Sequence, residues 1–445
     1  MTAYWCESAW LDGAIHPGVL VETDGTRITT VQSGLSCPDS METTALPGLV
    51  LPGFANAHSH AFHRALRGRT QYGAGDFWTW RDRMYGIAAR LDPDSYGELA
   101  AAVYAEMALA GITCVGEFHY LHHRAGGHPY GDPNEIGHAL IGAAARAGIR
   151  ITLLDTCYLT GGIGVGLSGV QHRFGDSDAH AWAERVAALA NGAATATPHA
   201  RIGAAVHSLR AVPLSGVDTA VALAAELRAP LHVHLSEQPA ENEAVLAAYG
   251  RTPTQALADR GALTPGTTAV HATHLTAADI ALLGEGGTAI CLCPTTEREL
   301  ADGIGPAPEL AGAGAALALG SDSHAVIDMF EEARAVELDE RLRSGQRGTF
   351  APATLLRAST VDGHASLGWP DAGRIAVGQH ADLVAVDTGS VRTAGVDPAQ
   401  IVFAASAADV RHVVASGKLI VRDGRHLGIP DVAAALSTAI AAVWE

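Results

Sequence analysis

The middle of the chain repeats one pattern: a short apolar, β-branched run, a polar motif, and then an alanine-rich stretch with helical character. Regular alternation of strands with helices indicates βαβ units and a parallel sheet. We expect helices at residues 95–110, 133–147, 179–191 and 217–227, among others. We expect strands at residues 48–54, 112–117, 150–155, 201–206, 231–235, 268–270, 288–293 and 315–320.

Eight such units over roughly 300 residues predict an α/β fold built on a closed (β/α)₈ barrel of the TIM type. The alternative is an open doubly wound sheet, but no glycine-rich phosphate loop follows the first expected strand. Short β-like segments with turns replace the pattern at both ends. We therefore expect a metal-binding barrel at residues 49–371 and a small β-sandwich domain that residues 1–48 and 372–445 build together.

The charge balance limits the kinds of partner. Acidic residues number 47 and basic residues 29, for a formal net charge of −18, and such a field repels nucleic-acid backbones. We see no signal peptide at the start and no stretch long and apolar enough to cross a membrane. The six cysteines lack the spacing of a disulfide framework. We expect a cytoplasmic protein that binds neither nucleic acid nor membrane.

Candidate metal ligands follow the expected strands, where active residues of such barrels lie. His58 and His60 are two residues apart, so both imidazoles leave an extended segment on one side. His234 ends the fifth strand and Asp322 follows the eighth, which gives one divalent ion three nitrogens and a carboxylate. The only lysine is Lys418, which excludes a lysine-bridged metal pair. One zinc ion per chain suits this imidazole-rich set, with Fe²⁺ and Mn²⁺ as open alternatives.

Two further groups suit hydrolytic chemistry at that ion. Zinc lowers the pKa of water from about 15.7 to about 7, and Asp322 beside it can take the proton of the nucleophile. Glu237 is placed to carry protons to a departing nitrogen, although Ser236 to Pro239 also looks like an ordinary helix start. His271 ends the sixth strand and can stabilise the attacked centre.

Residues 51–62 resemble the first-strand motif of the formimidoylglutamate deiminase family, within the amidohydrolase superfamily. Residues 80–85, 116–123, 206–210 and 293–297 resemble it too, so the similarity covers nearly the whole chain. The resemblance implies a zinc-dependent homodimer that converts N-formimino-L-glutamate to N-formyl-L-glutamate and ammonia in histidine degradation. In that reaction metal-activated hydroxide attacks the formimino carbon. By position, His58, His60, His234 and Asp322 match the family's metal ligands, and Glu237 and His271 match its catalytic pair.

The same resemblance suggests how an acidic protein holds a substrate with two carboxylates. Arg210 can grip a carboxylate with two parallel hydrogen bonds, and Tyr120 and His207 match positions that contact substrate. Arg83 is a candidate for a further carboxylate partner and could reach the substrate from the second subunit of a dimer. Arg81 is the alternative candidate. His63 departs from the glutamine usual in the family, and its protonation could add pH dependence.

Other interpretations stay open. A deaminase or chlorohydrolase for a purine, triazine or related ring would favour aromatic stacking, and Arg210 argues against it. A metal-free binding module would be expected to have lost metal ligands, and none is missing. Cys291 and Cys293 could form a metal or redox pair, but we expect buried thiols. A second metal site in the histidine-rich segment 119–123 is less favoured, because this segment resembles a substrate loop.

Overall fold

The computed structural model describes residues 2–37, 43–71, 77–192 and 197–445, and these form two eight-stranded sheets. The barrel sheet is parallel, and its strands neighbour one another in chain order. An isolated parallel bridge between Ser59 and Asp322 joins its first and last strands. The predicted (β/α)₈ barrel is therefore confirmed. Its strands are β5 (Phe54–Ser59), β6 (Ile112–His119), β7 (Arg150–Cys157), β8 (Ala200–Val206), β9 (Leu231–Leu235), β10 (Thr267–His271), β11 (Ala289–Leu292) and β12 (Leu317–Leu319).

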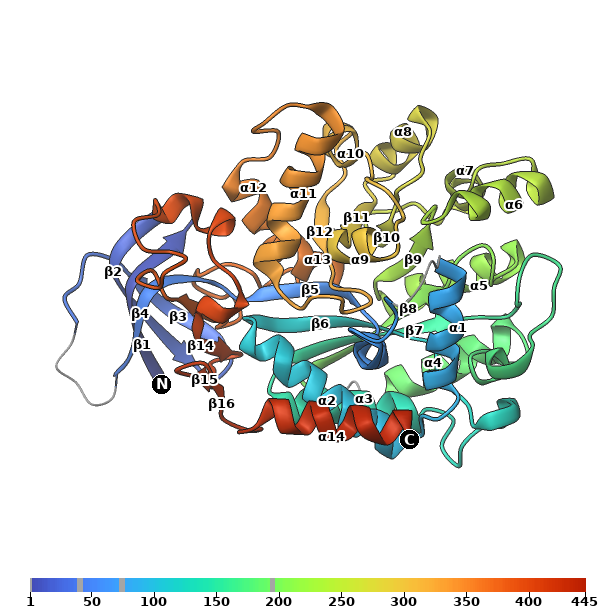
Figure 1. The fold of residues 1–445 in the computed structure, drawn as a ribbon, viewed down its shortest axis with the longest axis horizontal. Coiled ribbons are helices and arrows are strands. Elements are labelled where there is room, and N and C mark those ends of the chain that lie inside the picture. The colour runs from blue at the N-terminus through green and yellow to red at the C-terminus, as the bar shows by residue number, and fades with distance from the viewer. Residues whose placement is uncertain (1, 38–42, 72–76, 193–196) are drawn as a thin grey trace.

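Helices surround this barrel (Figure 1). Local signals set their ends: Asp92 accepts a hydrogen bond from Ser95 N at 2.8 Å and Pro93 opens α2, while Gly148 ends α3 at φ +77°. The longer helices are α1 (Phe77–Ala88), α2 (Pro93–Leu109), α3 (Glu135–Ala147), α4 (Ala179–Gly192), α5 (Leu214–Leu227), α6 (Pro239–Tyr249), α8 (Ala277–Glu285), α11 (Met329–Ser344) and α14 (Val432–Trp444). The shorter ones are η1 (Ala61–Leu66), η2 (Ala125–Gly127), η3 (Gly169–Arg173), α7 (Pro253–Ala258), α9 (Pro294–Glu299), α10 (Ala307–Gly312), α12 (Pro352–Arg357), η4 (Ala358–Asp362), α13 (Gly363–Ser366), η5 (Pro398–Phe403) and η6 (Ala407–Asp409).

The second sheet is mixed and uses both ends of the chain, as the sequence predicts. It lies at one end of the barrel, on the left of Figure 1. Its order is β16-β15-β14-β13-β4-β1-β2-β3, so β4 and β13 join the two halves. Its strands are β1 (Thr2–Leu11), β2 (Ala14–Asp24), β3 (Arg27–Gln32), β4 (Thr43–Pro52), β13 (Leu383–Val386), β14 (Val410–Ala415), β15 (Lys418–Arg422) and β16 (Arg425–His426).

The expected first barrel strand, residues 48–54, is wrong. Residues up to Pro52 belong to β4 of the terminal sheet, and the barrel begins only at Phe54. Burial explains the error, because the apolar run from Leu49 to Pro52 is as buried as a barrel strand and looks the same in the sequence. Gly53 carries the chain across, since a Cβ there would lie 2.5 Å from Thr113 Oγ1.

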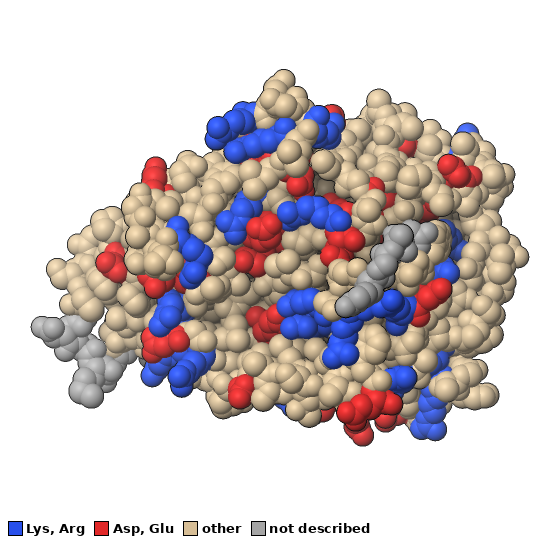
Figure 2. Space-filling model, viewed as in Figure 1, with Lys and Arg blue, Asp and Glu red and all other residues tan. Residues whose placement is uncertain are grey.

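Helix α14 lies against α2 of the barrel, although the sequence places its residues with the small β domain (Figure 1). It buries Val432, Leu436 and Val443. None of the helices in the described part of the chain combines the length and apolar character that a membrane span needs. On the face shown in Figure 2, Lys and Arg side chains gather in several groups, so the net charge of −18 is not spread evenly.

Candidate metal centre and active site

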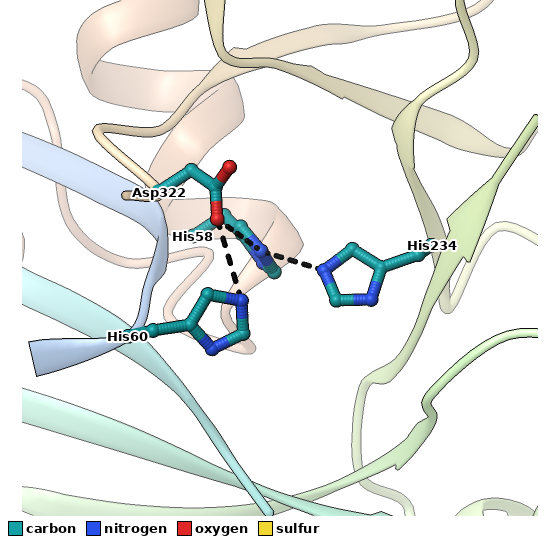
Figure 3. Close-up of side chains that lie close together, drawn as sticks. All are labelled: His58, His60, His234 and Asp322. Atoms are coloured by element: carbon teal, nitrogen blue, oxygen red, sulfur yellow. Dashed lines mark hydrogen bonds and ion pairs between the residues drawn. The ribbon is translucent and has the colours of Figure 1, made fainter. Parts of the chain in front are cut away.

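The four predicted ligands meet at the C-terminal edge of the barrel (Figure 3). His58 lies in β5 and His60 directly after it, His234 lies in β9, and Asp322 follows β12. One nitrogen or oxygen atom of each lies within 4.8 Å of the others, and all four side chains are buried. Asp322 Oδ1 is 3.3 Å from Nε2 of His58 and 3.3 Å from Nε2 of His60. His58 and His234 bring their Nε2 atoms to 3.0 Å.

Backbone carbonyls orient two of these imidazoles. His60 Nδ1 lies 2.9 Å from Phe118 O, and His234 Nδ1 lies 2.9 Å from His207 O. A carbonyl only accepts, so each ring carries its proton on Nδ1 and turns the Nε2 lone pair inward. Burial lowers the pKa of all three histidines, that of His58 to about 3. Neutral nitrogen lone pairs and a carboxylate at these distances repel one another, so the donor set fits a divalent cation between them.

Close backbone packing makes this convergence possible. Asp322 N donates to His58 O at 3.0 Å, and His60 N donates to Asp322 O at 3.3 Å. Gly320 lies behind His58, and a Cβ at Gly320 would be 2.7 Å from His58 Cβ. Asp322 has φ +40° and His271 has φ +68°, backbone conformations that residues other than glycine rarely adopt. Such strained residues concentrate at functional sites, and here they aim two side chains into the barrel mouth.

The predicted catalytic pair lies beside the centre. His271 Nε2 is 3.8 Å from Glu237 Oε1 and 3.9 Å from Asp322 Oδ2, while Nδ1 is 3.4 Å from Glu297 Oε1. Burial lowers the pKa of His271, but these carboxyl groups outweigh it and hold the pKa well above its usual value. Burial also raises the pKa of Glu237. Both groups thus lie where a proton donor and a proton acceptor of the reaction are needed.

A cavity of about 570 Å³, which includes its open mouth, reaches the centre. Four residues that the sequence suggests for substrate binding line it: His63, Tyr120, His207 and Arg210. His63 Nε2 lies 2.9 Å from Tyr120 OH. Burial holds the pKa of His63 well below its usual value, so this side chain is a neutral hydrogen-bonding group rather than an added charge.

The structure separates the two candidate arginines of α1. Arg81 lines the cavity, with its guanidinium 4.6 Å from the ring centre of Trp78 and 5.3 Å from that of Tyr85. Arg83 does not line it and donates to the carbonyl oxygen of Arg69. Within one chain, Arg81 is therefore the arginine of this pair that lines the cavity.

The sequence analysis did not single out an aromatic wall of the cavity, which Trp80, Tyr85, Tyr158 and Phe174 form. Gln171 Nε2 donates to Tyr85 OH at 3.1 Å and to Tyr158 OH at 3.3 Å, which fixes both phenols. Tyr158 directly follows β7, so the strand-end rule could have found it. Trp80 and Tyr85 lie in the segment 80–85 that resembles the family, although that resemblance drew attention to its arginines. No comparable signal marks Phe174, because loop aromatics usually belong to cores.

Two other candidate sites are less suited to a separate metal or redox centre. Cys291 and Cys293 are buried free thiols, as expected. His119, His122 and Asp155 form a second buried cluster within 4.8 Å. Asp155 already binds Arg185 through two hydrogen bonds of 2.8 and 2.9 Å, and this guanidinium disfavours a further cation.

Residues 49–420 match the amidohydrolase family model. Formimidoylglutamate deiminase of Pseudomonas aeruginosa is 37% identical over 397 residues, 86% of this chain and 87% of that protein. 5-Methylthioadenosine/S-adenosylhomocysteine deaminase of Halobacterium salinarum is 30% identical over 428 residues, 93% and 90% of the two chains. The crystal structure of an amidohydrolase from Brucella melitensis superposes with a TM-score of 0.92 at 29% identity over 100% of both chains. The chain therefore belongs to the amidohydrolase family and is a hydrolase that acts on carbon–nitrogen bonds other than peptide bonds.

Proposed function

We propose that this enzyme hydrolyses N-formimino-L-glutamate to N-formyl-L-glutamate and ammonia, using one zinc ion. The observation that carries the proposal is a single cavity with two arginines, Arg81 and Arg210, beside a centre of three histidines and an aspartate. The substrate has matching groups: two carboxylates for the two arginines, and one amidine-like group for the metal centre. The 37% identical deiminase from Pseudomonas aeruginosa supports the same substrate.

The carboxylates are the groups that the arginines would hold. Arg81 and Arg210 can each form paired hydrogen bonds to a carboxylate, and the surrounding aromatic rings exclude water that would weaken them. Tyr120, His207 and His63 complete the binding residues of the proposal with neutral hydrogen-bonding groups. The formimino group then lies toward Glu237 and His271.

The donors His58, His60, His234 and Asp322 would hold the ion, and their imidazole-rich set suits zinc better than Mg²⁺ or Ca²⁺. A bound divalent ion supplies Lewis acidity, which makes water nucleophilic near neutral pH. The attacking water loses two protons in the reaction. Asp322 and Glu237 would accept them in turn, and Glu237 would deliver both to the imino nitrogen, so that the C–N bond breaks as ammonia leaves. His271 would donate a hydrogen bond to the oxygen that adds to the formimino carbon. Oxygen thus replaces nitrogen on the formimino carbon, and ammonia leaves.

A second candidate is deamination of a purine nucleoside or another ring. The aromatic wall of Trp80, Tyr85, Tyr158 and Phe174 favours it, because aromatic side chains stack on rings. The relative from Halobacterium salinarum is a deaminase of this kind. The paired arginines favour the carboxylate substrate instead. Assembly as a homodimer is also part of our proposal, and sedimentation equilibrium would measure it.

The decisive experiment is ammonia release from N-formimino-L-glutamate by zinc-loaded protein, with formimino-L-aspartate and 5-methylthioadenosine alongside. We expect ammonia and N-formyl-L-glutamate from the first compound. Loss of a charged, bidentate contact in Arg210→Met should then lower kcat/KM about 100-fold. Arg251→Met, at an exposed ion pair with Asp259, should keep wild-type kcat/KM. Release of ammonia from the nucleoside but not from the formimino amino acid would reject the proposal in favour of ring deamination.

A further inference from the structure

A chain of buried hydrogen bonds crosses the seam of the barrel, where β5 meets β12. Asn56 Nδ2 donates to Ser321 Oγ at 2.7 Å, and Ser321 Oγ lies 2.9 Å from His324 Nδ1. His324 Nε2 lies 3.1 Å from Ser59 Oγ, and Ser59 Oγ donates to Glu117 Oε2 at 2.7 Å. All five side chains are fully buried. The chain therefore links the ends of β5, β6 and β12 without water.

One direction of donation satisfies every member when Glu117 is a carboxylate. Ser59 gives its hydroxyl hydrogen to this carboxylate, so its oxygen accepts from His324 Nε2–H. His324 then offers its Nδ1 lone pair to the hydroxyl of Ser321, whose oxygen accepts from Asn56 Nδ2–H. The amide oxygen of Asn56 accepts from Ser321 N at 2.9 Å and closes the other end. Changing any member leaves a neighbour without its partner.

The members alternate in sequence with the metal ligands. Ser59 lies between His58 and His60, and Ser321 and His324 lie on either side of Asp322. Glu117 also accepts from the backbone N–H of Ala61 at 2.7 Å, so one carboxylate holds the chain on both sides of His60.

The seam has hydrogen bonds beyond this chain, since Arg67 Nε donates to His324 O and Ser323 N donates to Thr296 Oγ1 at 3.1 Å. Its main-chain bonds at the centre are those between Asp322 and the two histidines, at 3.0 and 3.3 Å. Asp322 and His324 both have positive φ, 40° and 58°, so this turn needs partners to keep it in place. The side-chain hydrogen bonds supply such partners on both sides of Asp322.

We propose that Ser59, Glu117 and His324 are positioning residues, which hold β5 and β12 at the separation that lets His58, His60 and Asp322 share one divalent ion. This inference rests on the proposed metal centre. Groups that orient metal ligands typically contribute a factor of about 10 to 100 to metal affinity. A network that only stabilised the fold would affect unfolding without a specific effect on metal binding.

The test compares two buried serines in zinc competition against a chromogenic chelator. Ser59→Ala breaks the chain between His324 and Glu117. Ser359→Ala is the matched control, because Ser359 is equally buried and donates to Leu355 O at 3.0 Å, within its own helical segment. We expect the zinc Kd to rise about tenfold or more in Ser59→Ala and less than about twofold in Ser359→Ala. Metal-free Ser59→Ala should melt at a lower temperature than metal-free Ser359→Ala, because it leaves two buried partners unpaired, so both zinc Kd values are measured well below either melting temperature.

Glu117→Gln gives a second, nearly isosteric variant. If its amide NH₂ faces Ala61 N–H, two donors meet; if it faces Ser59, the hydroxyl must turn from donor to acceptor and reverse the chain. We therefore again expect a zinc Kd about tenfold higher or more. Wild-type zinc affinity in Ser59→Ala and Glu117→Gln would overturn the positioning role and leave the proposed deiminase activity intact. Equal loss of zinc in Ser359→Ala would overturn it as well. A wild-type protein that binds no zinc would reject the metal centre itself.

Discussion

At the scale of single residues, Arg81 and Arg83 show how much two positions on one helix can differ. Residues two apart in an α-helix point about 200° apart, and only Arg81 faces the cavity. We therefore predict that Arg81→Met raises the KM for N-formimino-L-glutamate about tenfold or more, because a carboxylate loses a charged partner. Steady-state kinetics of ammonia release measures this.

Arg83→Met is the natural control, since it removes the same charge from the same helix. Its KM should stay within about twofold of wild type, because the Arg83 guanidinium is directed to the carbonyl of Arg69. The reverse ranking would show that Arg83 reaches the substrate from a second subunit and that Arg81 does not.

The clustering of the four candidate metal ligands was the predictable part of this site, because His58 and His60 share one side of an extended strand and His234 and Asp322 lie at strand ends. The choice between Arg81 and Arg83 was not predictable, because the rotation of α1 about its axis depends on its packing. The strained turn at Asp322 was not predictable either, because an aspartate in the sequence does not indicate a φ of +40°.

At the scale of elements, one buried ion pair connects the barrel to the terminal sheet. Arg150, at the start of β7, donates to both carboxylate oxygens of Asp382 at 2.9 and 2.6 Å, just before β13. Asp382 also accepts from Ser416 N at 2.8 Å. Burial raises the pKa of Asp382, but Arg150 outweighs this and holds the pKa at about 2.

We predict that Arg150→Met lowers the free energy of unfolding by about 3–5 kcal/mol, because it leaves the Asp382 carboxylate buried without its cation. Arg146→Met removes an arginine from an exposed pair with Glu98 and should cost less than about 1 kcal/mol. Urea denaturation of the three proteins at neutral pH compares them. Equal losses in both variants would show that the buried pair does not hold the two parts together.

The positions of strands along the chain were more predictable than the sheet to which each strand belongs. The predicted strand at residues 150–155 was recognisable from its apolar and β-branched residues, and it lies within β7. The run from Leu49 to Pro52 was equally recognisable, yet it pairs with β1 and β13 rather than with the barrel. Local composition indicates a buried strand, but the partner depends on contacts far away in sequence.

For the whole molecule, alternation of strands and helices was enough to predict the barrel, because only a few topologies bury eight parallel strands. The β-rich flanks predicted a second sheet. The docking of α14 on α2 was not predictable, since an alanine-rich amphipathic helix can cover many apolar surfaces. The contacts at the junction between the two sheets were not predictable either. His364 of α13 lies at this junction, with Nε2 3.1 Å from Gly53 O.

His364 makes the stability of the molecule depend on pH. Burial, reinforced by the charge of Arg150, lowers the pKa of His364 to about 4 in the folded protein, whereas an unfolded histidine titrates near 6.5. Between these values the unfolded state binds more protons than the native state, so this residue's contribution to stability falls as pH falls. The loss is about 1.4 kcal/mol for each pH unit below about 6.5.

We therefore predict that lowering the pH from 7.5 to 5 costs the wild type about 2 kcal/mol more unfolding free energy than it costs His364→Gln. Glutamine can still donate to Gly53 O but takes up no proton, so it removes the linkage and keeps the contact. Urea denaturation at both pH values measures the difference. Between pH 7.5 and 8.5 it should stay constant, because an unfolded histidine is already neutral there. A difference that is also constant down to pH 5 would mean that His364 is protonated in the native junction.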